Sequence, residues 1–142
     1  MLRAMRVGGV IAAAAVLSTL LLVACGGDDD DSGSQLAEAQ ATPAKAIDEI
    51  GETSAGLDQA LAQLRDGDAK AAKETVAETY LQHFEEVEGP LEKVDPKLME
   101  KLEDGISGDL RADIGKASVN EISAQVKRLK ADLATAKSKL EG

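Results

Sequence analysis

The sequence predicts an all-α protein, an up-down four-helix bundle preceded by a flexible tether. Hydrophobic residues make up 44% of the 142 residues, but aromatic residues make up only 1%. A core built mainly from Ala, Leu, Ile and Val favours helices over sheets. Apolar residues also recur at spacings of three and four along residues 43–140, and cap or turn signals interrupt this pattern at short intervals. Together these observations predict four helices that share one core.

The first helix is expected over residues 43–65. Thr42 followed by Pro43 is typical of an N-cap and a proline at the first helical position. Ser54 occupies one position of the expected buried seam, and the other positions are apolar: Ile47, Ile50, Leu57, Leu61 and Leu64. The segment Asp66-Gly67-Asp68 predicts a turn, with Asp68 capping the next helix.

The second helix is expected over residues 69–88. One face carries Ala72, Val76, Tyr80, Phe84 and Val87. Gly89-Pro90 is expected to end this helix, because glycine is a common C-terminal residue and proline cannot continue the hydrogen-bond ladder. A short link through Leu91 and Val94 then leads to the next helix.

The third and fourth helices also have clear start signals. Asp95-Pro96 marks the start of the third helix, which is expected over residues 96–114 and is followed by Gly115. Its apolar stripe consists of Leu98, Leu102, Ile106, Leu110 and Ile114. Ser118 and Glu121 form a capping-box pattern before the fourth helix. The seam of that helix comprises Val119, Ile122, Val126, Leu129, Leu133, Ala136 and Leu140.

The charge of the chain is strongly acidic and unevenly distributed. The formal net charge is −10, and it becomes −12 when residues 1–24, which contain two arginines, are removed. Such a charge excludes electrostatic binding to nucleic acid or to an anionic lipid surface. The last helix is the basic part, and we expect its cations to neutralise acidic neighbours rather than to form a binding patch: Lys127, Arg128, Lys130, Lys137 and Lys139.

Residues 1–24 have the layout of a signal peptide, with a short basic start and an uncharged apolar run from Val7 to Ala24. Leu22-Val23-Ala24-Cys25 resembles the bacterial lipobox. This resemblance implies that the Cys25 thiol receives a lipid, that cleavage follows Ala24, and that the protein is held on the extracytoplasmic side of the cell membrane. The alternative is that residues 7–24 remain as an uncleaved anchor helix.

Residues 25–34 are predicted to be the acylated cysteine and a flexible Gly/Asp tether, which leaves residues 35–142 for the helical domain. Two or three acyl chains would anchor the protein stably. The run Asp28 to Asp31 could chelate a hard cation, but a solvated charge run is the simpler interpretation.

The candidate binding residues lie at the end of the second helix, which carries the only Tyr, His and Phe of the chain. His83 with Glu86, or Glu85 with Glu88, are three residues apart and could converge on one metal ion. The alternative interpretation makes His83 a side chain at the edge of the core and the glutamates a solvated rim. No nucleophile motif or phosphate-binding loop is present, so the sequence predicts no enzyme.

One stretch resembles the extracytoplasmic helical extension of some bacterial high-affinity iron permeases. The resemblance rests on Tyr80-x-x-x-Phe84-Glu85-x-x-Glu88, then Leu91, Leu102-Glu103 and Leu110-Arg111. It implies a role in iron uptake, with Glu85, Glu88 and Glu103 as the acidic positions of the pattern. His83 is a further candidate ligand from the polar end of the second helix. The membrane helices of a permease and their Arg-Glu-x-x-Glu motifs are absent from this sequence.

The sequence thus predicts a lipid-anchored extracytoplasmic protein that binds iron or another hard cation as an accessory to a membrane iron permease. The alternative is a structural or partner-binding envelope lipoprotein that binds no metal and catalyses no reaction.

Replacement of Cys25 tests the predicted anchor. In Cys25→Ala the acyl chains have no thiol to join, because Cys25 is the only cysteine. We expect incorporation of a radiolabelled fatty acid to be lost and the precursor to accumulate. A variant that is still labelled and cleaved after Ala24 would contradict the lipobox assignment.

Overall fold

The computed structural model describes residues 41–142, which belong to one compact unit, Leu36–Gly142. The predicted signal peptide, the predicted lipidation site Cys25 and the predicted tether lie outside the described residues. Among the helices that are described, none is long and apolar enough to cross a membrane.

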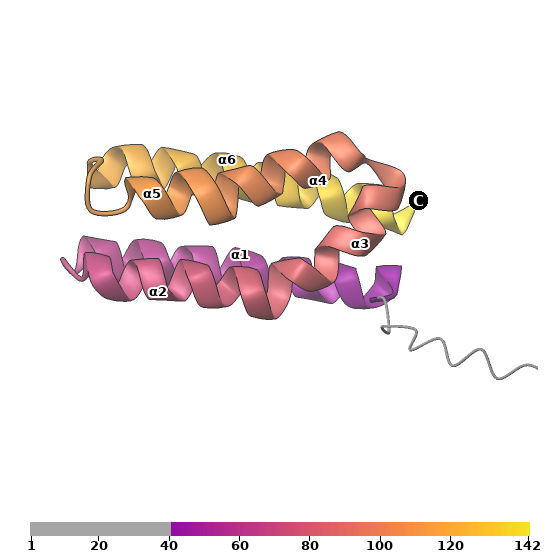
Figure 1. Cartoon of the computed structure of the whole chain (residues 1–142), viewed down its shortest axis with the longest axis horizontal. Coiled ribbons are helices and arrows are strands. Elements are labelled where there is room, and N and C mark those ends of the chain that lie inside the picture. Colours follow the sequence, from indigo (N-terminus) through magenta and orange to yellow (C-terminus); the bar gives the residue numbers. More distant parts are fainter. Residues whose placement is uncertain (1–40) are drawn as a thin grey trace, which may run out of the picture. The chain divides into compact units, whose positions relative to one another are not determined.

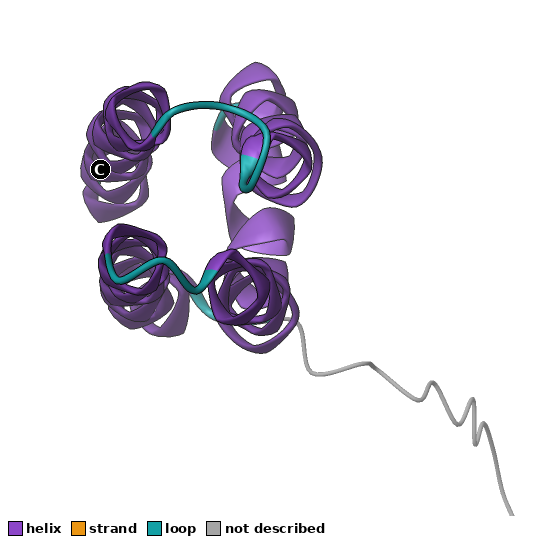
Figure 2. Cartoon of the chain, turned by 90° about the vertical axis from the view of Figure 1, so that its left-hand side faces the viewer, coloured by secondary structure: helices purple, strands orange, loops and turns teal. Residues whose placement is uncertain are grey.

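Four antiparallel helical rods enclose the core (Figures 1 and 2), which confirms the predicted all-helical bundle. The first rod is α1 (Pro43–Arg65) and the last is α6 (Val119–Glu141). The two middle rods each contain a π-helical segment. The second consists of α2 (Ala69–Thr79), η1 (Tyr80–Phe84) and α3 (Glu85–Val94), and the third of α4 (Pro96–Glu103), η2 (Asp104–Leu110) and α5 (Arg111–Asp113).

All four predicted helix starts are confirmed by their hydrogen bonds. The side chains of Thr42, Asp68 and Asp95 each accept a hydrogen bond from a backbone N–H three residues later. Ser118 and Glu121 form a complete capping box, in which the Ser118 N–H donates to Glu121 Oε2 at 2.8 Å. Gly67 and Gly115 have φ of 88° and 81°, which explains why glycine ends the first and third rods.

The core contains the expected stripes, with one change of position in α1. Thr53, and not Ser54, is fully buried, and its hydroxyl donates to the Glu49 carbonyl oxygen at 2.8 Å. Ile47 is only partly buried, and Val119 at the start of α6 is exposed. In α1 the buried positions are therefore Ala46 and Thr53 in place of Ile47 and Ser54, so the seam there lies one residue nearer the N-terminus than expected.

Small residues let α1 and the second rod approach closely. A Cβ atom on Gly56 would lie 2.1 Å from the Oγ1 atom of Thr79, which is itself buried. This separation is far shorter than the contact distance of two non-bonded heavy atoms, so a side chain at position 56 would push the two rods apart.

The prediction that Gly89-Pro90 ends the second helix is wrong. Helix α3 continues through both residues to Val94, and Asp95 alone links it to α4. The proline ring and Leu91 are buried in the core, and this burial offsets the loss of one backbone hydrogen bond. The rod bends where η1 meets α3, so that α3 crosses from the layer of α1 and α2 to that of α4 (Figure 1).

The two π-helical segments follow from the spacing of the apolar residues. Residues 72, 76, 80 and 84 of the second rod, and residues 98, 102, 106, 110 and 114 of the third, repeat every four positions. An α-helix has 3.6 residues per turn, so a strict spacing of four drifts around its surface. A π-helical turn contains more residues, and one such segment in each rod brings the stripe back to the core.

Ion pairs between the rods agree with the expectation that basic residues of α6 neutralise acidic neighbours. Lys130 pairs with Asp58 of α1, and Lys139 Nζ lies 3.1 Å from Asp95 Oδ2. Asp95 also accepts the hydrogen bond from the Leu98 N–H, and these two contacts lower the pKa of its carboxyl. The α3–α4 corner is thereby joined to the C-terminal end of α6.

Truncation of a core leucine tests this bundle. Leu133 of α6 is fully buried, so Leu133→Ala should reduce the free energy of unfolding by about 2–5 kcal/mol in a denaturant titration. Leu81→Ala is the matched control, because 59% of the Leu81 side chain is exposed, and its effect should stay within about 0.5 kcal/mol. Equal effects of the two substitutions would contradict the packing.

Candidate functional site

The candidate residues separate into two polar groups on the second rod. The first group forms around Tyr80, whose hydroxyl donates a 2.7 Å hydrogen bond to Glu88 Oε1. Tyr80 belongs to η1 and Glu88 to α3, two turns apart, and the ring of Tyr80 also packs against buried Phe84 with centroids 5.8 Å apart. The core therefore positions Tyr80, and Tyr80 positions Glu88.

Glutamates around this pair create a strongly acidic environment. Burial raises the pKa of Glu88, the Tyr80 hydrogen bond opposes that rise, and repulsion from Glu103, Glu85 and Glu92 adds to it. Burial and the same hydrogen bond also raise the pKa of the Tyr80 hydroxyl well above its usual range. Glu103 comes from the end of α4, so the bundle brings carboxylates of two rods together. We call Tyr80, Glu85, Glu88, Glu92 and Glu103 the acidic cluster.

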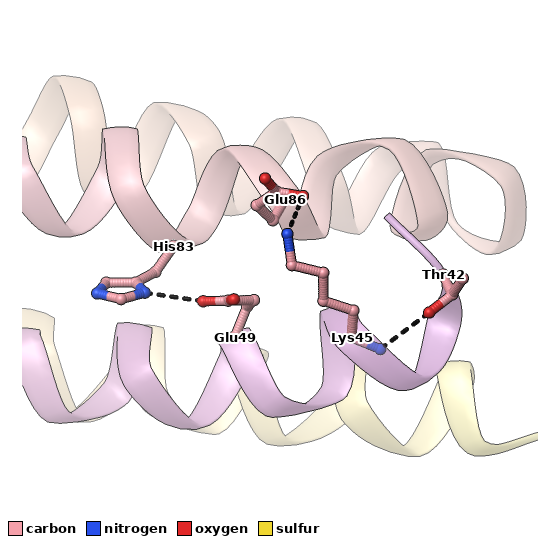
Figure 3. A network of polar contacts seen from close by, with 5 residues as sticks. All are labelled: Thr42, Lys45, Glu49, His83 and Glu86. Carbon is pink, nitrogen blue, oxygen red and sulfur yellow. Dashed lines mark hydrogen bonds and ion pairs between the residues drawn. The ribbon is translucent and has the colours of Figure 1, made fainter. Parts of the chain in front are cut away.

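The second group links η1 and α3 to α1 (Figure 3). His83 Nδ1 lies 2.8 Å from Glu49 Oε2, and the Nζ of Lys45 lies 2.9 Å from Glu86 Oε2. The Lys45 backbone N–H donates to the Thr42 hydroxyl at 3.2 Å, so the start of α1 is tied to the same network. These contacts hold His83 and Glu86 against α1.

The structure therefore brings together some of the sequence-predicted residues and separates others. Glu88 and Glu103 are partly buried in the acidic cluster, whereas Glu85 is exposed at its edge. His83 is engaged with Glu49 instead. Within residues 41–142, no group of three or more His, Cys, Asp or Glu side chains is arranged to hold a metal ion.

Sequence reasoning missed Glu49 as a partner of His83 and, although it named Glu88 as a candidate ligand, did not place Glu88 beside Tyr80. Glu49 lies 34 positions before His83, and no sequence motif links them, because only the packing of α1 against η1 brings the two together. Glu88 was expected on the flank of a regular α-helix. The extra residue of the π-helical segment returns it to the side of Tyr80, and the spacing of four in the apolar stripe is the signal that could have revealed this.

The acidic cluster offers carboxylate oxygens and one phenol oxygen. Such hard donors bind hard cations, including Fe³⁺, better than soft ones. The imidazole–carboxylate pair of His83 and Glu49 provides a nitrogen donor on another part of the surface and does not add to the cluster.

Comparison of the chain with protein-family models, curated proteins and solved structures finds no match.

Neutralising Glu88 tests the electrostatics of the cluster. Its folded-state pKa is raised, so the charged carboxylate destabilises the fold increasingly as the pH rises through that value. Glu88→Gln keeps an oxygen that accepts from Tyr80 but carries no charge. We expect a higher melting temperature than wild type at pH 7, and a difference that shrinks as acid protonates Glu88.

Glu121→Gln provides a control of opposite sign. The hydrogen bonds from Ser118 lower the pKa of Glu121, so its charge stabilises the fold above the unfolded-state pKa and this contribution is lost on acidification. We expect this variant to melt below wild type at pH 7. The same sign of effect in both variants would contradict the assigned environments.

Proposed function

We propose that this chain is a lipid-anchored extracytoplasmic protein whose acidic cluster captures a hard cation, with iron as the favoured ion, and passes it to a membrane permease. The observation that carries the proposal is the gathering of Glu85, Glu92 and Glu103 around the partly buried Glu88, which Tyr80 holds through a 2.7 Å hydrogen bond. A bound cation stabilises carboxylates that are held close together, because its attraction for each of them replaces their mutual repulsion.

The permease-like pattern supports the same location. Its apolar members Phe84, Leu91, Leu102 and Leu110 are all buried in the core. Of its polar members, Tyr80, Glu85, Glu88 and Glu103 belong to the acidic cluster, although Glu103 is far from the others in sequence, whereas Arg111 is not part of that cluster. The pattern therefore separates into residues that build the corner of the bundle and residues that line one face of it.

Cation binding requires a small rearrangement of side chains. Tyr80 holds one oxygen of Glu88, and the other oxygen, together with exposed Glu85, is free to turn towards an ion that Glu103 also reaches. Protons compete with the cation for these carboxylates, so binding should weaken as the pH falls through the raised pKa of Glu88.

A partner-binding envelope lipoprotein without a metal is the second candidate. It is favoured by one observation, that no group of three ligands is already arranged for a metal within residues 41–142. In that case the bundle surface would recognise another protein, and added metals would leave its stability unchanged.

Thermal melting with added ions separates the two candidates. We expect ferric citrate, or ferrous ion without oxygen, to raise the melting temperature of the full chain in non-ionic detergent, because an ion that binds only the folded state adds RT ln(1 + [L]/Kd), about 2.7 kcal/mol at a hundredfold excess over Kd. Glu85→Gln/Glu88→Gln should abolish the shift. His83→Gln is the matched control and should retain it.

Three results would contradict the cluster as the site. An unchanged melting temperature with Fe, Mn, Zn and Cu would leave the partner-binding candidate. An iron shift that survives the double variant would place the site elsewhere, and its loss on replacing Asp28 to Asp31 with Asn would identify that run. A shift that depends on His83 alone would indicate a softer, imidazole-dependent site.

A further inference from the structure

The described chain enters the bundle at the end where the α3–α4 corner and the C-terminus lie (Figure 1). Lys45, in the first turn of α1, pairs with Glu86 of α3, with Nζ 2.9 Å from Oε2. Lys139, near the end of α6, lies 3.1 Å from Asp95 Oδ2 at the corner. These contacts join the start of α1, the corner and the end of α6 at one end of the bundle, which we call the corner end.

The opposite end of the bundle is formed by the turn between α1 and α2 and by the start of α6. Helices α1 and α6 have 23 residues each, so each is about 35 Å long. Val94, the last residue of α3, and Val119, the first residue of α6, lie at opposite ends, about 30 Å apart along the bundle axis. Both side chains are exposed, Val94 by 51% and Val119 by 38%.

The acidic cluster belongs to the half of the bundle nearest the corner end. Its members Glu85, Glu88 and Glu92 all lie on α3, whose Glu86 contacts the first turn of α1. Glu103 ends α4, which starts at the corner and has 8 residues, so it lies about 12 Å along that rod. A cation held by this cluster is therefore closer to the corner end than to the opposite end.

The distance between the predicted lipid and the bundle is limited by the chain that joins them. Residues 26–40, which number 15, separate Cys25 from the described residues. A flexible tether of this length, as the composition predicts, has a root-mean-square span of about 20 Å, which is shorter than the bundle. Because the tether joins the bundle at the start of α1, the corner end is on average nearer to the membrane than the opposite end.

The charge of the chain disfavours the alternative orientation, in which a long side of the bundle lies on the lipid. The chain is strongly acidic, so an anionic lipid surface repels it. Even on α6, the basic rod, Lys130 is paired with Asp58 and Lys139 with Asp95. The tether, and not one of the sides, therefore sets how the bundle faces the membrane.

From these observations we propose that the corner end faces the membrane and is the surface at which a membrane protein receives the cation. This inference rests on the proposed function, because it uses both the lipid anchor and the cation site. It adds which part of the bundle meets the acceptor, namely α3, the corner and the first turn of α1. The end that carries Val119 faces away from the membrane.

Energy transfer from the bundle to the lipid surface tests this orientation. Val94→Cys and Val119→Cys each introduce one thiol for a donor dye, because the only native cysteine, Cys25, is blocked when it carries its lipid. The lipidated chain is placed in vesicles of phosphatidylcholine and phosphatidylglycerol whose headgroups carry an acceptor dye. We expect the donor at position 94 to lose more fluorescence than the donor at position 119.

A longer tether is the matched control. Inserting about thirty Gly/Ser residues after Ser34 raises the root-mean-square span to about 37 Å, which is comparable with the length of the bundle. The difference between the two labels should then shrink. A difference that the longer tether leaves unchanged would overturn the proposal, because the tether would not set the orientation.

Equal energy transfer from the two labels, or greater transfer from position 119, would also overturn the proposal. The Glu85→Gln/Glu88→Gln variant should lose the iron-dependent shift in melting temperature and keep the difference in energy transfer, so failure of the cation site and failure of the orientation are distinguishable. Cys25→Ala should abolish transfer from both labels. Transfer that persists in that variant would contradict the lipid anchor itself.

Discussion

The structure depends on one packing constraint, that the apolar stripes of its two middle rods repeat every four residues. A regular α-helix cannot keep such a stripe on one side, because each step of four residues rotates it further around the helix. The wider turns of η1 and η2 correct that rotation and keep Phe84, Ile106 and Leu110 in the core. With almost no aromatic side chains available, burial of these aliphatic groups is the main source of stability, so the helices adapt to the stripes.

Each wider turn also has a consequence on the outer surface. In the second rod, η1 returns Glu88 to the side of Tyr80, and this contact places a glutamate where its neighbours repel it. In the third rod, η2 and its glycines leave a groove beside α6. π-helical turns are often found at functional sites, since they change the direction of side chains without breaking the helix. The acidic cluster of this protein lies beside such a turn.

The corner between α3 and α4 connects these features to the rest of the bundle. Buried Pro90 and Leu91 let the second rod bend across to the opposite layer, and Asp95 caps α4 while it pairs with Lys139 of α6. The corner thereby brings Glu103 of α4 near Glu88 of α3. A helix that ended at Gly89 would have left a longer link between the elements that carry these two carboxylates, whereas Asp95 alone joins α3 to α4.

The sequence by itself determined the number of helices, their starts and most of the core. Caps such as Thr42 and Ser118 act through hydrogen bonds within three residues, and apolar periodicity acts within one helix, so both can be recognised in a linear sequence. Only the tertiary structure decided that the second rod stays helical through Pro90 and that Thr53 is buried in place of Ser54. It also decided that His83 pairs with Glu49 and that Glu103 lies near Glu88. These outcomes depend on which rods are neighbours and how closely they pack, and no local pattern in the sequence specifies the distance between two helices.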